Sequence, residues 1–194
     1  MANPAIRPLS LEEYFEIERA SDERHEFLDG EVFAMSGASL AHNLIDAQLV
    51  QSLGPRVRDA GCTLVSGNLR VRVAKTGLYT YPDAVIFCGT AELSREGGLD
   101  TLLNPRVLFE ILSPSTEAYD RTTKFDHYRT ISTLDEYVLL AQDERRVEVF
   151  RRAPAATPED QSRWDLEEVR GDGVLRLASL DVSVPLDEIY SGVA

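Results

Sequence analysis

Apolar residues between about Ser39 and Ala60 recur every three or four positions, which is the spacing of one face of a helix. The recurring residues are Leu44, Ile45, Leu49, Leu53 and Val57. This pattern predicts a long amphipathic helix, ended by Gly61 and bent at Gly54-Pro55.

Two local signals organise the N-terminal part of the chain. Ser10 and Glu13 have the spacing of a capping box, which predicts a short helix through about Arg19. Asp29-Gly30 is a hairpin dipeptide, and it separates two short extended pieces.

Three strand-like stretches follow the long helix. Residues 63–73 alternate between apolar and polar side chains, whereas residues 79–87 and 106–112 are almost continuously apolar, as in central strands that are covered on both faces. Residues 89–105 contain Gly97-Gly98, and we expect them to form a long surface loop.

The remainder of the chain is predicted to be rich in strands. In order, we expect a helix over 122–131, a strand pair over 136–141 and 147–152, a polar excursion over 154–161, and a final hairpin over 163–169 and 174–177. This order of elements predicts an α/β domain with a mixed sheet.

Two acidic residues stand in apolar surroundings. Asp83 follows Pro82 at the start of an apolar run, and Glu110 lies in the middle of Val107–Leu112. Such a charge is costly to bury unless it is paired or bound to a metal. A salt bridge to an arginine would explain either acid alone, but two acids on successive strands also favour a site for Mg²⁺ or Mn²⁺.

A second group of polar residues follows the strand that carries Glu110. Asp120, Lys124 and Tyr128 are spaced four residues apart, so on a helix they share one face. A solvated ion pair would explain Asp120 and Lys124. Alternatively, Lys124 reaches back toward the end of the strand and meets a phosphate or an attacking water.

Composition and charge limit the classes of function. The chain has 194 residues, of which 43% are hydrophobic, so it can bury a core and the length fits one domain, 1–194. The formal net charge of −13 argues against a nucleic-acid coat protein or a membrane-surface protein. An enzyme acting on nucleic acid is still compatible, because it needs cations only locally.

Cysteine usage and the N-terminal residues bear on the cellular compartment. Cys62 and Cys88 have no CxxC spacing, and we expect buried free thiols rather than a zinc site. Met1 to Leu9 lack a signal-peptide pattern, and no apolar run approaches the length of a membrane span. These features predict a cytoplasmic protein.

The quoted residues also resemble, in order, a known family. The matching positions are His25-Glu26, Gly30-Glu31, His42, Pro82-Asp83, Glu110 with Ser113-Pro114-Ser115-Thr116, Asp120, Lys124, Tyr128 and Glu136-Tyr137. Together they resemble the Uma-two family of restriction-endonuclease-like proteins, a branch of the PD-(D/E)xK nuclease superfamily. The resemblance covers roughly residues 10–152 and leaves residues 153–194 as a C-terminal β extension.

This resemblance implies a restriction-endonuclease-like core that hydrolyses DNA, with a homodimer expected because duplex cleavage needs two sites. Asp83 and Glu110 would hold Mg²⁺ or Mn²⁺, with Glu26 as a further acidic contributor. The superfamily pattern has a lysine two residues after the glutamate, where this chain has Leu112. The resemblance suggests that Lys124 has taken over that role; a non-catalytic binding or regulatory module is the alternative.

Several other polar residues have less specific interpretations. His42 either approaches the site or caps its helix, whereas His25 and His127 are expected at the surface. The acidic residues between Glu12 and Glu18 are expected to form a solvated helix face. The cations that could contact phosphate are Arg70, Arg72, Arg121 and Lys124, although a cross-strand ion pair also explains the first two.

Overall fold

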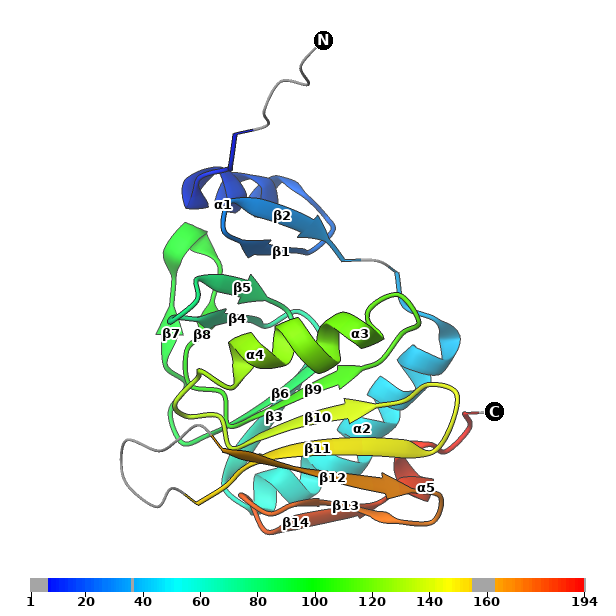
Figure 1. Ribbon diagram of the computed structural model, residues 1–194. Helices are drawn as coiled ribbons and strands as arrows, with labels where there is room; N and C mark the ends of the chain where they lie inside the picture. Colours follow the sequence, from blue (N-terminus) through cyan, green and yellow to red (C-terminus); the bar gives the residue numbers. More distant parts are fainter. Residues whose placement is uncertain (1–6, 36, 155–162, 194) are drawn as a thin grey trace.

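The computed structural model describes residues 7–35, 37–154 and 163–193 (Figure 1). The strands are β1 (His25–Leu28), β2 (Glu31–Ala34), β3 (Cys62–Ser66), β4 (Arg70–Val73), β5 (Leu78–Thr80), β6 (Ala84–Cys88), β7 (Leu93–Ser94), β8 (Thr101–Leu102), β9 (Val107–Ile111), β10 (Glu136–Leu140), β11 (Arg146–Arg152), β12 (Trp164–Arg170), β13 (Val174–Leu177) and β14 (Val182–Pro185). The helices are α1 (Leu11–Ala20), α2 (Leu40–Asp59), α3 (Glu117–Tyr119), α4 (Phe125–Tyr128) and α5 (Leu186–Ile189).

The strands of the described residues form three sheets. One six-stranded sheet has the order β2-β1-β5-β4-β8-β7, and a second has the order β12-β11-β10-β9-β6-β3. Strands β13 and β14 form a separate pair. Because β9 and β10 are parallel while β6 and β9 are antiparallel, the second sheet is mixed, and the α/β class predicted from the sequence is confirmed.

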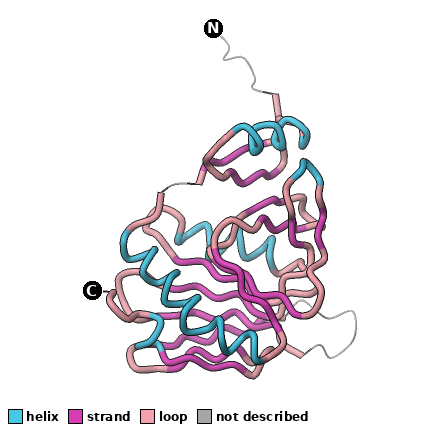
Figure 2. Tube along the Cα trace, turned by 180° about the vertical axis from the view of Figure 1, so that it is seen from behind, coloured by secondary structure: helices cyan, strands magenta, loops and turns pink. Residues whose placement is uncertain are grey.

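Helices cover both faces of the second sheet. The long helix α2 lies across one face, and the segment from α3 to α4 lies across the other (Figures 1 and 2). The alternation of β9 divides its side chains between these layers, because Phe109 joins the core beneath α2 and Leu108 joins the core beneath α4. No helix within the described ranges is long and apolar enough to cross a membrane.

Two stretches predicted as continuous strands are each divided between the two sheets. Residues 63–73 form β3 and β4, separated at Gly67, which has a φ of +82°. Residues 79–87 form β5 and β6, separated at Pro82, which has no backbone N–H to donate to a ladder. The chain therefore passes from one sheet to the other directly before Asp83.

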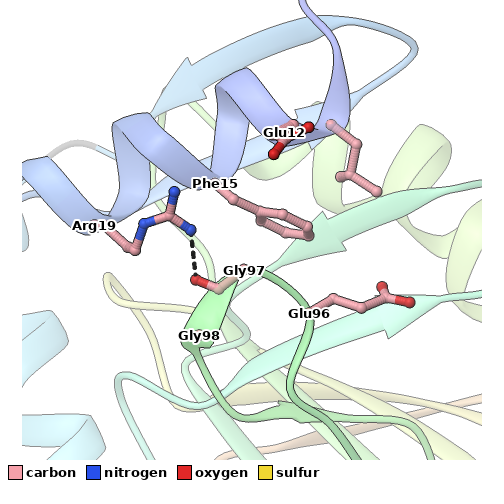
Figure 3. Close-up of a pocket in the computed structure, with 7 residues that line it drawn as sticks. Glu12, Phe15, Arg19, Glu96, Gly97 and Gly98 are labelled. Atoms are coloured by element: carbon pink, nitrogen blue, oxygen red, sulfur yellow. Dashed lines mark hydrogen bonds between the residues drawn. The ribbon is translucent and has the colours of Figure 1, made fainter.

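The N-terminal predictions are confirmed. Ser10 and Glu13 form the capping box of α1, and Asp29 and Gly30 turn the β1–β2 hairpin with φ values of +50° and +84°. The predicted loop over 89–105 is more ordered than expected, because it contains β7, β8 and a 3₁₀ turn at Glu96–Gly98. Figure 3 shows this turn against α1, where Arg19 donates a hydrogen bond to the carbonyl of Gly97.

The helix predicted over 122–131 begins earlier and ends earlier than expected. It runs without interruption from Glu117 to Tyr128, with a π-helical turn over Asp120–Lys124 between α3 and α4. Thr116 precedes it, so Ser113-Pro114-Ser115 ends the strand and the helix starts almost at once. The turn places Asp120, Lys124 and Tyr128 all in the protein interior.

The predicted C-terminal hairpin is wrong in its pairing. Strand β12 pairs with β11 in the second six-stranded sheet, whereas β13 pairs with β14 in the separate two-stranded sheet. The chain leaves the six-stranded sheet at the turn Gly171–Gly173. Residues 155–162 of the predicted polar excursion lie outside the described residues. Leu175, Val184 and Ile189 are fully buried in the core beneath α2, so the C-terminal segment completes that core.

The two cysteines are joined, which corrects the expectation of free thiols. Cys62 and Cys88 stand directly opposite each other on β3 and β6, and they form a disulfide with Cα atoms 4.1 Å apart. Spacing along the chain gave no sign of this pairing, because the antiparallel register of the two strands creates it.

Candidate functional site

Asp83 and Glu110 come from neighbouring strands. The β6–β9 ladder begins with Ala84 opposite Phe109, so Asp83 and Glu110 occupy the next pair of positions outward. Opposed residues in an antiparallel pair share a face. The backbone N–H of Ile111 donates a hydrogen bond of 2.6 Å to Oδ2 of Asp83, which fixes this carboxylate against β9.

Lys124 lies inside a group of carboxylates. Its Nζ is 2.9 Å from Oε1 of Glu110, 2.9 Å from Oε1 of Glu26 and 3.7 Å from Oδ1 of Asp120. All four residues are buried. The structure thus brings the predicted lysine to Glu110, and it also brings Glu26 and Asp120 there. We call Glu26, Glu110, Asp120 and Lys124 the carboxylate–lysine cluster.

Hydroxyl groups also donate hydrogen bonds to the two glutamates of the cluster. Tyr128 donates to Oε1 of Glu110 at 2.9 Å, and Thr80 donates to Oε1 of Glu26 at 2.5 Å. Tyr119 donates to Oε2 of Glu26 at 3.4 Å. The sequence analysis did not identify Thr80 and Tyr119, because nothing in their local sequence marks them. They become partners of Glu26 only when β5 and α3 pack beside it.

The electrostatics of the cluster are dominated by burial and by an excess of negative charge. Burial raises the pKa of Glu110 well above its usual value; Lys124 opposes this shift, while Asp83, Asp120 and Glu26 add to it. Burial likewise raises the pKa of Asp120. Burial lowers the pKa of Lys124, but the three carboxylates of the cluster outweigh it and leave that pKa well above the usual value. Burial therefore favours the protonated form of Glu110 and Asp120, while the carboxylates favour the charged form of Lys124.

His42 connects the long helix α2 to the site. Its Nε2 lies 3.2 Å from Oδ1 of Asp83. Burial lowers the pKa of His42, but the hydrogen bond to Asp83 and the charges of Asp83 and Asp46 outweigh burial, and the pKa is raised. Ser39, not His42, provides the side-chain cap of the helix. Asp46 was missed, although its i, i+4 spacing from His42 could have indicated it.

The arginines predicted to contact phosphate are engaged elsewhere. Arg70 is fully buried, and its Nε donates to Thr101 at 2.8 Å, which rules out a surface role for it. Arg72 forms an ion pair at 3.2 Å, but with Glu96 of the 3₁₀ turn and not with a residue of a neighbouring strand, and Arg121 pairs with Glu148 at 2.8 Å. Of the predicted cations, only Lys124 lies in the site.

The expectations for the histidines and for the acidic helix face need correction. Glu18 is buried and accepts hydrogen bonds from the backbone N–H of His25 and from Tyr81. His25 pairs with Glu18 through Nδ1 at 2.8 Å, so its side chain is only 13% exposed. His127 is half-buried. The buried face of α1 therefore includes Glu18, whose carboxylate accepts hydrogen bonds from residues elsewhere in the fold.

Two cavities flank these residues. A cavity of about 290 Å³ is lined by Asp83, Pro82 and Tyr81 together with Arg24 and Asn68, among others. A larger one of about 540 Å³ lies between α1 and the Glu96–Gly98 turn, where Phe15 and Arg19 line it (Figure 3). Neither cavity is lined by a member of the carboxylate–lysine cluster, but the smaller one is lined by Asp83 and therefore adjoins the candidate metal ligand.

The donor set can be tested against the divalent metal that the resemblance implies. Within the described ranges, no group of three His, Cys, Asp or Glu side chains is arranged to hold a metal ion. Mg²⁺, however, is commonly bound by one or two carboxylates, with water and substrate phosphate completing its shell. Asp83 and Glu110 supply two hard oxygen donors at facing positions, and a cation would offset the excess negative charge. The residues present therefore fit Mg²⁺ or Mn²⁺.

The mixed sheet and its covering helices have the arrangement of a restriction-endonuclease-like fold. Residues 11–183 match the sequence profile of the Uma2 family, which is described as "Putative restriction endonuclease". The chain belongs to this family, as the resemblance indicated.

Similar proteins agree with this assignment. The "Uncharacterized protein slr1290" of Synechocystis sp. is 30% identical over 96% of this chain and 93% of its own length. A second protein of that strain, "Uncharacterized protein sll1609", is 29% identical over 84% of this chain and 89% of its own length. A crystal structure described as "a putative nuclease belonging to DUF820" from Anabaena variabilis covers 93% of this chain and 98% of its own, with a TM-score of 0.69 and 19% identity. At that identity the likeness establishes the fold.

Proposed function

We propose that this protein is a nuclease that uses Mg²⁺ or Mn²⁺ to hydrolyse phosphodiester bonds of DNA. The observation that carries the proposal is that Asp83, directly before β6, accepts a hydrogen bond from Ile111 of β9 and lies one position beyond the Ala84–Phe109 pair, next to Glu110, while Lys124 is held 2.9 Å from Glu110. A divalent ion at this pair would polarise the phosphoryl group and lower the pKa of a bound water.

The chain's own residues have distinct parts in the proposal. Asp83 and Glu110 hold the metal, and the hydrogen bond from Ile111 orients Asp83. Lys124 favours the charged form of Glu110 against the effect of burial, and it is the candidate donor for the developing phosphate charge. Tyr128 restricts Glu110 to one orientation. A homodimer would present two such sites to a duplex.

A non-catalytic binding module is the second candidate, and two observations favour it. Leu112 stands where the superfamily has its lysine, and it is buried in the core beneath α4. The net charge is −13, and Arg72 and Arg121 are already paired with carboxylates. A module of this kind has no need of a metal site.

Cleavage assays and calorimetry separate the two candidates. Supercoiled, linear duplex and single-stranded DNA, together with RNA, are incubated with Mg²⁺ or Mn²⁺ and either the parent or Asp83→Asn. Asparagine retains an acceptor for the N–H of Ile111 but removes the charge, and exposed Asp59→Asn is the matched control. We expect Asp83→Asn, but not Asp59→Asn, to lose both cleavage and the heat of Mn²⁺ binding. Metal binding that survives Asp83→Asn, or a parent that cuts none of these substrates, would contradict the proposal.

A further inference from the structure

Arg24 lines the cavity beside Asp83. That cavity, of about 290 Å³, is lined by Arg24, Glu23, Tyr81, Pro82, Asp83 and Asn68 among others. Arg24 is half-buried, while Glu23 and Asn68 are exposed. A molecule that reaches Asp83 through this opening therefore passes the guanidinium of Arg24.

The guanidinium of Arg24 has no carboxylate partner among the described residues. By contrast, Lys124, Arg72 and Arg121 each form an ion pair with a carboxylate. Arg24 instead lies over the ring of Tyr81, with its Cζ 5.8 Å from the ring centroid. In a protein with a net charge of −13, a cation that is left without an acid beside a cavity is available to an anionic ligand.

Neighbouring groups hold Arg24 in place. Its carbonyl accepts a hydrogen bond of 2.9 Å from the N–H of Met35, which extends the β1–β2 pairing by one step. The ring of Tyr81 is buried, and its hydroxyl donates to Glu18, so the surface beneath the guanidinium is fixed. Arg24 and Glu26 are two residues apart along the same extended chain, so one strand supplies both the cavity and the carboxylate–lysine cluster.

We propose that Arg24 binds a backbone phosphate of the nucleic acid and thereby positions the phosphodiester beside Asp83. This inference rests on the proposed function. The planar fork of a guanidinium can donate two hydrogen bonds to one phosphate. Lys124 is buried and bonded to Glu26 and Glu110, so Arg24, which is half-buried and without a carboxylate partner among the described residues, is the better candidate to bind an incoming phosphate first. Since the acidic side chain of Glu23 also lines the cavity, a single phosphate contact is expected there.

The test compares Arg24→Gln with Arg24→Lys and with a matched control. Arg58 is exposed on α2, lies outside both cavities and has no ion pair among the described residues, so Arg58→Gln removes the same charge elsewhere. Binding of a fluorescein-labelled oligonucleotide, single-stranded in one arm and duplex in the other, is followed by fluorescence anisotropy over a range of salt concentrations. Arg24→Gln should weaken binding by about tenfold and reduce the salt slope by about 1. Arg24→Lys should restore part of the loss, and Arg58→Gln should bind as the parent does.

In the cleavage assay, Arg24→Gln should raise KM with little change in kcat, because the arginine positions substrate and does not act on the reacting atoms. If the parent binds the oligonucleotide through Arg24 but cleaves nothing, the proposed function fails and the phosphate contact stands. Equal binding by Arg24→Gln and Arg58→Gln, or a parent that does not bind the oligonucleotide, would overturn the inference. Thermal melts of each variant establish that a loss of binding is not a loss of fold.

Discussion

The ammonium of Lys124 and the carboxylate of Glu110 lie 2.9 Å apart, with each side chain only 6% exposed. Glu26 is equally close to the same nitrogen, and Asp120 lies 3.7 Å away. One buried cation therefore balances three buried acids, and its removal would leave all three uncompensated.

We expect Lys124→Met to destabilise the protein strongly at pH 8, by about 3 to 5 kcal/mol, because it leaves buried carboxylates without a counter-charge. The loss should be smaller at pH 5, where the variant can protonate the acids of the cluster. Urea unfolding at the two pH values measures both effects. Lys75→Met is the matched control, because Lys75 is exposed and has no ion pair among the described residues. Equal losses of stability for the two variants would contradict the buried arrangement.

The raised pKa of Glu110 predicts a specific dependence of stability on pH. Because the folded state holds this proton more tightly than the unfolded state, Glu110 makes the free energy of unfolding fall as the pH rises above about 4.5, the usual pKa of the group, through the higher folded pKa. Glu110→Gln keeps a hydrogen-bond acceptor for Tyr128 and removes the charge. We expect this variant to show a shallower decline than the parent between pH 5 and pH 8 in urea titrations. An unchanged pH profile would show that Glu110 does not titrate in this range.

Position 112 can be used to test whether an ammonium group on the Glu110 face of β9 can replace that of Lys124. Leu112 lies two residues after Glu110 and is buried in the core on the same side of β9. We expect Lys124→Met to lower DNA cleavage by two or more orders of magnitude, which corresponds to about 3 kcal/mol of transition-state stabilisation. Adding Leu112→Lys should restore part of the rate by returning an ammonium to the Glu110 face. A Lys124→Met variant that cleaves as fast as the parent would rule out a catalytic part for this lysine.

The Cys62–Cys88 disulfide should stabilise the β3–β6 pair. It closes a loop with a sequence separation of 26, for which restriction of the unfolded chain contributes about 3 kcal/mol. Reduction with dithiothreitol, or the double substitution Cys62→Ser and Cys88→Ser, should lower the urea midpoint to a similar extent. Maleimide labelling of both thiols in the unreduced protein would contradict the bond.

Local sequence signals predicted the elements that are governed by local chemistry. The period of the apolar residues of α2, the capping box at Ser10 and the Asp29-Gly30 turn all depend on neighbours within a few positions. The order of apolar runs also placed Asp83 and Glu110 on successive strands, and antiparallel pairing then brought them face to face.

Features created by tertiary contact could not be predicted in the same way. An alternating run does not indicate that Gly67 divides it between two sheets, because both halves satisfy the same pattern. Arg70 was expected to contact phosphate or to form a cross-strand ion pair, and Glu18 to lie on a solvated helix face. Thr101 and Tyr81, respectively, instead provide hydrogen bonds that make their burial possible. Arg24 was not identified because a lone arginine carries no signal until the cavity beside it is known.

The π-helical turn at Asp120–Lys124 makes the site sensitive to chain length as well as to residue identity. A π turn contains one residue more than an α-helical turn, so the helix before it and the helix after it are out of phase. Tyr119, on the first side, is directed to Glu26, and Tyr128, on the second side, is directed to Glu110. Deleting exposed Thr123 would remove this extra residue and convert the π turn into an α-helical turn, with every acid, the lysine and both tyrosines still in the chain. Asp120 and Lys124 would then be three residues apart instead of four, and cleavage by such a variant at the parent's rate would show that the site does not depend on the extra residue of the π turn.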